Sequence, residues 1–216
     1  MRVSVWPRLY AIVDAGVAAR AGWTPPDLAR AYLDGGARLL QLRASGVDPA
    51  IQFGWCREIV RLAVPRGARV ILNDRCDLAL MAGADGVHLG QLDLPIEASR
   101  RLLGSTALIG ISTHDAQQLA AAVRQRVSYL AIGPVYDTRT KDTGHGAVGL
   151  EAVRRTRSVV GTRPVVAIGG ITLATAPDVI AAGAASVAVI SDLLGGGDPA
   201  RRVGDYLDAL GELPTA

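Results

Sequence analysis

The chain of 216 residues carries 23 lysines and arginines against 20 aspartates and glutamates, a formal net charge of +3. Because the basic residues are spread along the chain, this charge does not indicate a nucleic-acid partner, although it suits a small anionic ligand. Half of the residues are hydrophobic, 25 are glycines and 4% are aromatic, which is typical of an α/β protein, and no uncharged stretch approaches the ~18 residues of a membrane span.

Eight short and nearly continuous apolar runs follow one another along the chain, as expected of parallel strands that are covered on both faces. They occupy residues 8–14, 39–43, 69–74, 86–90, 108–113, 129–135, 164–170 and 186–192. Segments of helical character lie between and after them, at 26–35, 48–64, 77–82, 95–103, 115–126, 150–159, 173–182 and 199–210. Eight strand-helix units in this length predict a (β/α)8 TIM barrel, with an open doubly wound sheet as the alternative. No linker divides the chain, so we expect a single domain, 1–216, with its core at about 8–211.

The two cysteines and the N-terminal residues bear on the cellular compartment in which the protein is located. Cys56 and Cys76 are too far apart for a CxxC pattern and too few for a disulfide framework, so we expect reduced thiols. The first residues, MRVSVWPRLY, contain no apolar run suited to a signal peptide. We therefore expect a cytoplasmic protein.

In a TIM barrel the active site lies at the carboxyl ends of the strands, where the following loops converge. Residues with polar side chains or free backbone groups fall at this end of most predicted strands. In chain order they are Gln41 and Arg43, Asn73 and Asp74, Gln91 and Asp93, Ser112, Thr138, Thr140 and Lys141, Gly169 and Gly170, and Ile190 and Ser191.

Two of these residues are carboxylates that follow neighbouring strands. Asp74 and Asp93 could share one Mg²⁺, since proteins usually hold this ion with one or two carboxylates, substrate phosphate oxygens and water. Arg43 and Lys141 could neutralise the remaining charge of a diphosphate. Taken singly, each Asp is equally explained as a helix cap, and Arg43 as part of a surface ion pair.

A second anion site is predicted from backbone groups. Gly169 and Gly170 precede a helix, and their N–H groups, with those around Ile190 and Ser191, could form the phosphate cradle that many barrels use. An ordinary glycine turn is the alternative. Together the two sites favour chemistry that joins two phosphorylated molecules.

Motifs along nearly the whole chain, from about residue 8 to residue 194, resemble those of the thiamine-phosphate synthase family. They are LYAIVD, QLR, ILNDRCDLAL, ADGVHLGQLDLP, IGIST, IGPVYDTRTK, VVAIGGIT and SVAVIS. The resemblance implies a (β/α)8 barrel that couples a hydroxymethylpyrimidine diphosphate to a plain or carboxylated thiazole phosphate, releasing diphosphate, with Mg²⁺ as cofactor and small molecules as partners. A homo-oligomer is compatible with the sequence.

Carried over to this chain, the resemblance implies three groups of site residues. Asp74 and Asp93 bind Mg²⁺. The pyrimidine diphosphate is contacted by the segment Gln41, Leu42, Arg43, Ala44 and Ser45, and by Asn73, Ser112 and Lys141. The thiazole phosphate is held by Thr138, Arg139 and Thr140, by Gly169 and Gly170, and by Ile190 and Ser191.

The implied mechanism is dissociative and needs no nucleophilic side chain. Arg43, Ser112 and Lys141 are the expected catalytic residues; Lys141 stabilises the departing diphosphate, while Ser112 either binds the leaving group or helps to move the amino proton. The histidines, His88, His114 and His145, are expected to be structural or exposed.

One position departs from the family pattern, which usually reads Q-x-R-x-K after the strand at 39–43. Here Ser45 stands in place of the lysine, which removes a contact to diphosphate worth ~1.5–3 kcal/mol. A related barrel, the thiazole tautomerase, carries a histidine where this chain has Pro134 and usually lacks the full carboxylate pair, so the sequence argues against that alternative. A barrel that binds thiamine precursors without turnover has only Ser45 in its favour.

Overall fold

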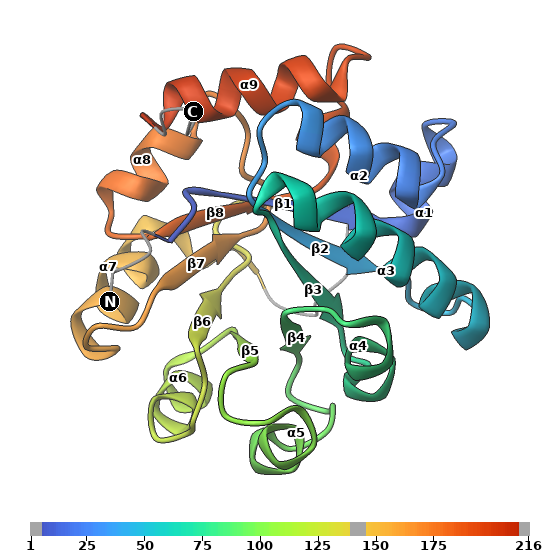
Figure 1. Ribbon diagram of the computed structural model, residues 1–216. Helices are drawn as coiled ribbons and strands as arrows, with labels where there is room; N and C mark the ends of the chain where they lie inside the picture. Colours follow the sequence, from blue (N-terminus) through green and yellow to red (C-terminus); the bar gives the residue numbers. More distant parts are fainter. Residues whose placement is uncertain (1–5, 139–145, 212–216) are drawn as a thin grey trace.

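The computed structural model shows a closed barrel of eight parallel strands, in the order β1-β2-β3-β4-β5-β6-β7-β8, surrounded by helices (Figure 1). The structure describes residues 6–138 and 146–211. Every neighbouring pair is parallel, and β1 closes the barrel against β8 through the pairs Leu9 with Val187 and Ala11 with Val189. This arrangement confirms the predicted (β/α)8 fold.

The strands lie where the apolar runs predicted them, although several end earlier. They are β1 (Leu9–Asp14), β2 (Leu39–Arg43), β3 (Arg69–Asn73), β4 (Gly86–Leu89), β5 (Leu108–Thr113), β6 (Tyr129–Ile132), β7 (Val165–Ile168) and β8 (Ser186–Val189). Strand β6 ends before Gly133 and Pro134, because proline has no N–H for the ladder.

The eight predicted helices are present within a few residues of their expected bounds. They are α2 (Pro25–Asp34), α3 (Pro49–Ala63), α4 (Cys76–Ala82), α5 (Ile96–Leu103), α6 (Ala116–Val123), α7 (Gly149–Val159), α8 (Ala176–Ala181) and α9 (Pro199–Ala209). The sequence did not predict the short helix α1 (Ala15–Arg20) or the 3-10 turns η1 (Val64–Arg66) and η2 (Ser191–Leu194). Helix α1 has only six residues, too few for helical periodicity to be visible.

The core has two layers because side chains alternate along each strand. The larger layer fills the space between barrel and helices and includes Leu40, Leu42 and Val87. The smaller layer fills the inside of the barrel and includes Tyr10, Ile71, Tyr129, Val166 and Ala188. The inner layer leaves an opening at the carboxyl ends of the strands, where the candidate site lies.

Among the residues that the structure describes, no helix combines the length and the apolar character that a membrane crossing requires.

Candidate functional site

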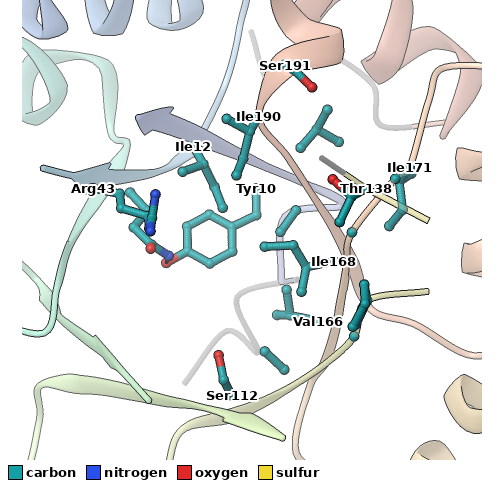
Figure 2. Close-up of a pocket in the computed structure, with 18 of the residues that line it drawn as sticks. Tyr10, Ile12, Arg43, Ser112, Thr138, Val166, Ile168, Ile171, Ile190 and Ser191 are labelled. Carbon is teal, nitrogen blue, oxygen red and sulfur yellow. Dashed lines mark hydrogen bonds between the residues drawn. The ribbon is translucent and has the colours of Figure 1, made fainter. Parts of the chain in front are cut away.

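A cavity of about 470 Å³ opens at the carboxyl ends of the strands, as expected of a TIM barrel (Figure 2). Many of the predicted site residues line it: Gln41, Arg43, Asn73, Ser112, Thr138, Gly169, Gly170, Ile190 and Ser191. The other lining residues were not among those predicted for the site: Tyr10, Ile12, His88, His114, Ala131, Gly133, Pro134, Asp137, Val166, Ile168, Ile171, Thr172, Ala188, Val189 and Asp192.

Alternation along β2 divides the predicted diphosphate segment into two groups. Gln41 and Arg43 line the cavity, whereas Leu42 and Ala44 are buried among the core residues between barrel and helices. Ser45 follows in an exposed turn outside the cavity lining. The side chains of Leu42, Ala44 and Ser45 are therefore not brought into the cavity with those of Gln41 and Arg43, and the expected contact of this part of the segment with the diphosphate stays a prediction.

Arg43 is held by a partner that the sequence analysis missed. Its guanidinium donates to the Asp14 carboxylate, and the two residues lie opposite each other at the ends of β1 and β2. The other Asp14 oxygen accepts from the Val17 N–H at 2.9 Å and so caps α1. One buried carboxylate thus starts α1 and orients a cavity arginine.

A hydrogen-bonded series of side chains runs through the barrel interior. Gln41 Nε2 donates to Tyr10 OH at 2.8 Å, and the Tyr10 and Tyr129 hydroxyls lie 3.0 Å apart. His88 Nδ1 is 2.9 Å from Tyr129 OH, and His88 Nε2 is 2.8 Å from Ser112 Oγ. Burial raises the pKa of both tyrosines, so their hydroxyls stay protonated.

The histidines were expected to be structural or exposed, and two of them are hydrogen-bonded residues of the cavity wall. His88 and His114 both line the cavity, and His114 Nδ1 is 2.6 Å from the Gly133 carbonyl oxygen. His88 stands between Val87 and Leu89, which both face outward. Period-two alternation within β4 was the signal that could have placed it inside. His145 lies outside the described residues.

The predicted phosphate cradle depends on two glycines in left-handed conformations. Gly169 has a φ of 99° and Gly170 a φ of 63°. A Cβ on Gly170 would lie 2.5 Å from the Asp137 carbonyl oxygen, and one on Gly169 would lie 2.5 Å from Pro134 Cα. Glycine is therefore required on both steric and conformational grounds, and the loop after β7 packs directly on the loop after β6.

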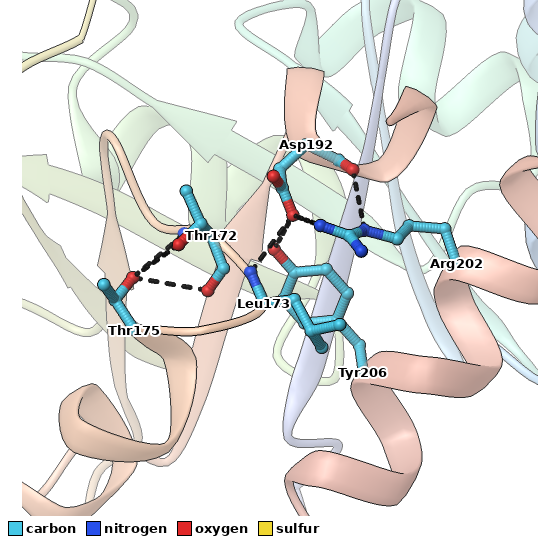
Figure 3. Close-up of polar contacts among 6 residues, drawn as sticks. All are labelled: Thr172, Leu173, Thr175, Asp192, Arg202 and Tyr206. Carbon is cyan, nitrogen blue, oxygen red and sulfur yellow. Dashed lines mark hydrogen bonds and ion pairs between the residues drawn. The ribbon is translucent and has the colours of Figure 1, made fainter. Parts of the chain in front are cut away.

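A carboxylate behind the cradle connects its two loops (Figure 3). Asp192 Oδ2 accepts from the Leu173 N–H at 3.1 Å, from Arg202 Nη2 at 2.8 Å and from Tyr206 OH at 2.5 Å. Arg202 Nε also donates to the Asp192 carbonyl oxygen at 3.2 Å. Helix α9 thereby holds the loop after β8, next to Ser191, against the loop after β7.

The two predicted metal ligands lie at neighbouring strand ends. Asp74 follows β3 with a φ of 64°, and its N–H donates to the His88 carbonyl oxygen at 2.9 Å. Asp93 Oδ2 accepts from the Gly90 N–H at 2.6 Å. Both residues are partly buried, and neither is among those that line the cavity. Two carboxylates at adjacent strand ends, next to the cavity residue Asn73, are a donor set that fits Mg²⁺.

No group of three or more His, Cys, Asp or Glu that could hold a metal occurs in residues 6–138 and 146–211. The predicted phosphate and catalytic residues Arg139, Thr140 and Lys141 lie outside the described residues.

Comparisons with known proteins agree with this geometry. A family model described as thiamine monophosphate synthase matches residues 9–193. A thiamine-phosphate synthase from Koribacter versatilis is 43% identical over 206 residues, covering 94% of this chain and 96% of that protein. A thiamine-phosphate synthase from Chlorobium limicola is 42% identical over 176 residues, covering 82% and 83%.

The structural comparison leads to the same family. A solved thiamine phosphate pyrophosphorylase from Pyrococcus furiosus superposes with a TM-score of 0.85 at 29% identity, covering 95% of this chain and 96% of that one. A 3-hexulose-6-phosphate synthase, at 16% identity and a TM-score of 0.67, shares the fold alone. On the match of the family model and the identity to these relatives, the chain belongs to the thiamine monophosphate synthase family.

Proposed function

We propose that this protein is a transferase that couples 4-amino-2-methyl-5-(diphosphooxymethyl)pyrimidine to a thiazole phosphate, giving thiamine phosphate and diphosphate. The observation that carries the proposal is one cavity whose two ends differ in chemistry and each suit an anion. Arg43 and Asn73 lie at one end, and the glycine cradle with Ser191 lies at the other. Apolar side chains, among them Ile12 and Ile168, line the space between them (Figure 2).

The residues at the first end suit the departure of a diphosphate. Arg43 supplies a guanidinium, and Lys141, which lies outside the described residues, would supply a second cation. Mg²⁺, when bound by Asp74 and Asp93, would add charge that neutralises the leaving group. Cations aimed at the leaving oxygens are more strongly bound as negative charge develops there, which lowers the barrier.

The reaction that we propose proceeds in two bond changes. The bond between the pyrimidine methylene carbon and the diphosphate oxygen breaks, and its electron pair leaves with the diphosphate. The aminopyrimidine ring supports the resulting methylene cation, and the thiazole nitrogen then forms the new C–N bond with its lone pair. The apolar walls formed by Val166, Ile168 and Ala188 exclude water, which would otherwise compete for the cation.

The second end would hold the thiazole phosphate through backbone groups. Gly169 and Gly170 allow the chain to approach the ligand without side chains in the way. Ser191 begins η2, and Thr138 lies on the cavity wall at the end of the described part of the loop after β6. These groups bind and orient the acceptor, so that its nitrogen faces the pyrimidine.

Pro134 supports the synthase over the tautomerase alternative. It lies on the cavity wall at the position where the tautomerase carries its histidine. Proline can neither accept nor donate a proton, so this position offers no acid or base. We also propose a location in the cytoplasm, where the free and buried thiols of Cys56 and Cys76 stay reduced.

The test is to incubate the purified protein with both phosphorylated precursors and Mg²⁺ and to measure thiamine phosphate by chromatography. The variant with Asp74→Asn and Asp93→Asn, purified in the same way, controls for host enzyme carried through purification. We expect product with the wild type and little with the variant. A wild-type sample that binds both precursors and forms no product would point instead to a binding protein without turnover.

A further inference from the structure

The side chains that connect Gln41 to Ser112 form a continuous series across the inside of the barrel. Both ends line the cavity. Tyr129, in the middle, is fully buried and is not one of the lining residues. Successive heavy atoms are between 2.8 and 3.0 Å apart, so each step is a normal hydrogen bond.

The hydrogen atoms in this series can be placed by counting donors. Gln41 Nε2 can only donate, so Tyr10 OH accepts from it. The single Tyr10 hydrogen then goes to Tyr129 OH, 3.0 Å away. Within the described part of the chain, the next acceptor for the Tyr129 hydrogen is His88 Nδ1. That nitrogen is therefore without a proton.

The neutral imidazole then has its hydrogen on Nε2, because one ring nitrogen of neutral histidine donates while the other accepts. His88 Nε2–H donates to Ser112 Oγ at 2.8 Å. Ser112 Oγ thus accepts a hydrogen bond from His88. Its own hydrogen remains to be donated, and Ser112 lines the cavity.

We propose that this series of hydrogen bonds holds the Ser112 hydroxyl as a donor directed into the cavity, so that the ligand atom meeting Ser112 is a hydrogen-bond acceptor. Tyr129 and His88 are then positioning residues that act through Ser112. The ligand class is a molecule that presents an unprotonated acceptor atom to Ser112, which a diphosphate oxygen or an unprotonated ring nitrogen of the pyrimidine diphosphate provides. This inference deepens the proposed function and rests on it for the identity of the ligand, which would be the pyrimidine diphosphate.

Two further contacts show how the barrel accommodates the Tyr129 side chain. A Cβ on Gly110 would lie 2.0 Å from Tyr129 Cζ and 2.4 Å from its hydroxyl oxygen, so β5 has a glycine where this phenol ring passes. The His88 imidazole stacks on the Tyr129 ring, with centroids 5.6 Å apart and planes at 23°. These contacts fix the position of the Tyr129 ring and therefore the positions of its hydroxyl and of the two hydrogen bonds that it makes.

The opposite direction is the competing arrangement, and it makes a different prediction. If the Gln41 amide is turned so that its oxygen accepts from Tyr10, every hydrogen in the series reverses. His88 then carries its proton on Nδ1, and Ser112 donates to Nε2. In that case Ser112 would accept from a donor on the ligand, such as its amino group, instead of donating to the ligand.

The tautomer of His88 decides between these directions without any assay of activity. We would label the protein with ¹⁵N-histidine, assign the His88 signals by comparison with His88→Gln, and read the protonated nitrogen from nitrogen-proton couplings at a fixed neutral pH. Hydrogen on Nε2 in the wild type supports the proposal, and hydrogen on Nδ1 overturns it.

Kinetics then test whether Tyr129 acts through Ser112. Tyr129→Phe removes only the hydroxyl, and we expect kcat/KM for the pyrimidine diphosphate to fall about tenfold, with KM for the thiazole phosphate unchanged. The matched control is Tyr32→Phe, another fully buried tyrosine whose hydroxyl has no hydrogen-bond partner among the described residues. If kcat/KM for the pyrimidine diphosphate fell equally in both variants, the cause would be a general packing effect, and the positioning role of Tyr129 would be overturned.

The double variant gives the sharpest result. In a Ser112→Ala background the hydrogen-bonded series no longer has the hydroxyl that it orients. Adding Tyr129→Phe should therefore lower kcat/KM for the pyrimidine diphosphate no further. Additive losses would overturn the proposal. Should the wild type form no thiamine phosphate, the proposed function fails, while the tautomer measurement still decides the inference about Ser112.

Discussion

Arg43 and Asp14 form an ion pair across the carboxyl ends of β1 and β2, at the edge of the cavity. Their side chains are 20% and 9% exposed, so the pair is largely removed from water. Asp14 compensates the charge that Arg43 would offer to a diphosphate, and it also caps α1. The cavity cation is therefore well oriented but partly neutralised.

Asp14→Asn should separate these two effects. The amide oxygen can still cap α1, but the negative charge is lost, so we expect the free energy of unfolding to fall by about 1–3 kcal/mol. We also expect inorganic diphosphate to bind more tightly, because the Arg43 charge is no longer compensated. Chemical denaturation and calorimetric titration measure the two quantities. A weaker diphosphate affinity would show that orientation of Arg43 matters more than its net charge.

The control for this variant is Asp27→Asn. Asp27 pairs with Arg30 on the surface of α2, where the side chains are 50% and 44% exposed. Exposed pairs contribute about 0–1 kcal/mol, so this change should leave both stability and diphosphate binding close to those of the wild type.

Arg202→Met should weaken the thiazole phosphate end of the cavity. Arg202 holds Asp192, which in turn accepts from the Leu173 N–H and so joins the two cradle loops. Losing this charged contact should raise KM for the thiazole phosphate about tenfold, or about 1.4 kcal/mol, and leave KM for the pyrimidine diphosphate unchanged. Arg201→Met, at the exposed neighbouring position, is the matched control. An equal rise for both substrates would contradict a role confined to the cradle.

Gly170→Ala should abolish thiazole phosphate binding at measurable concentrations. Gly170 has a φ of 63°, and an added Cβ would meet the Asp137 carbonyl oxygen at 2.5 Å. Gly67→Ala is the control, because Gly67 has a φ of 62° but open space around its Cβ position. That change should cost about 1 kcal/mol of stability through its conformation alone and leave steady-state kinetics unaltered. Similar kinetics for both variants would rule out the steric argument.

The strands and the main helices were predictable because buried parallel strands give short continuous apolar runs that stand out from amphipathic helices. The site was predictable where polar side chains or glycines stand at or just after the carboxyl end of a strand. Tyr10 lies near the start of β1 and points inward, and in a continuous apolar run nothing distinguishes the inward face from the outward one. His88 differs, because its polar side chain between the outward-facing Val87 and Leu89 was a signal for the inward face. Leu42 was assigned to the site because it stands between Gln41 and Arg43, although alternation turns it toward the helices.

Substitution of the predicted metal ligands by asparagine should make turnover insensitive to Mg²⁺. Asparagine tolerates the left-handed conformation of Asp74, whose φ is 64°, so the backbone is retained. We expect Asp74→Asn and Asp93→Asn each to lower kcat at least a hundredfold at saturating substrates and to abolish the Mg²⁺ dependence of diphosphate binding. Asp77→Asn, an exposed carboxylate paired with Arg75, serves as the control. Wild-type rates in the presence of chelator would contradict the metal assignment.

Ser45→Lys should strengthen the binding of the pyrimidine diphosphate. Ser45 lies in an exposed turn directly after β2, two residues beyond Arg43. Because Asp14 compensates the charge of Arg43, a lysine at this position would not face an uncompensated like charge from that side. We therefore expect kcat/KM for the pyrimidine diphosphate to rise about tenfold, equivalent to about 1.4 kcal/mol, with KM for the thiazole phosphate unchanged. The matched control is Ser105→Lys, which adds the same charge in the exposed turn before β5, at the opposite end of the barrel. If both lysines produced the same rise, the gain would come from net charge and steering. If Ser45→Lys weakened binding, another cation would already occupy the space over the diphosphate.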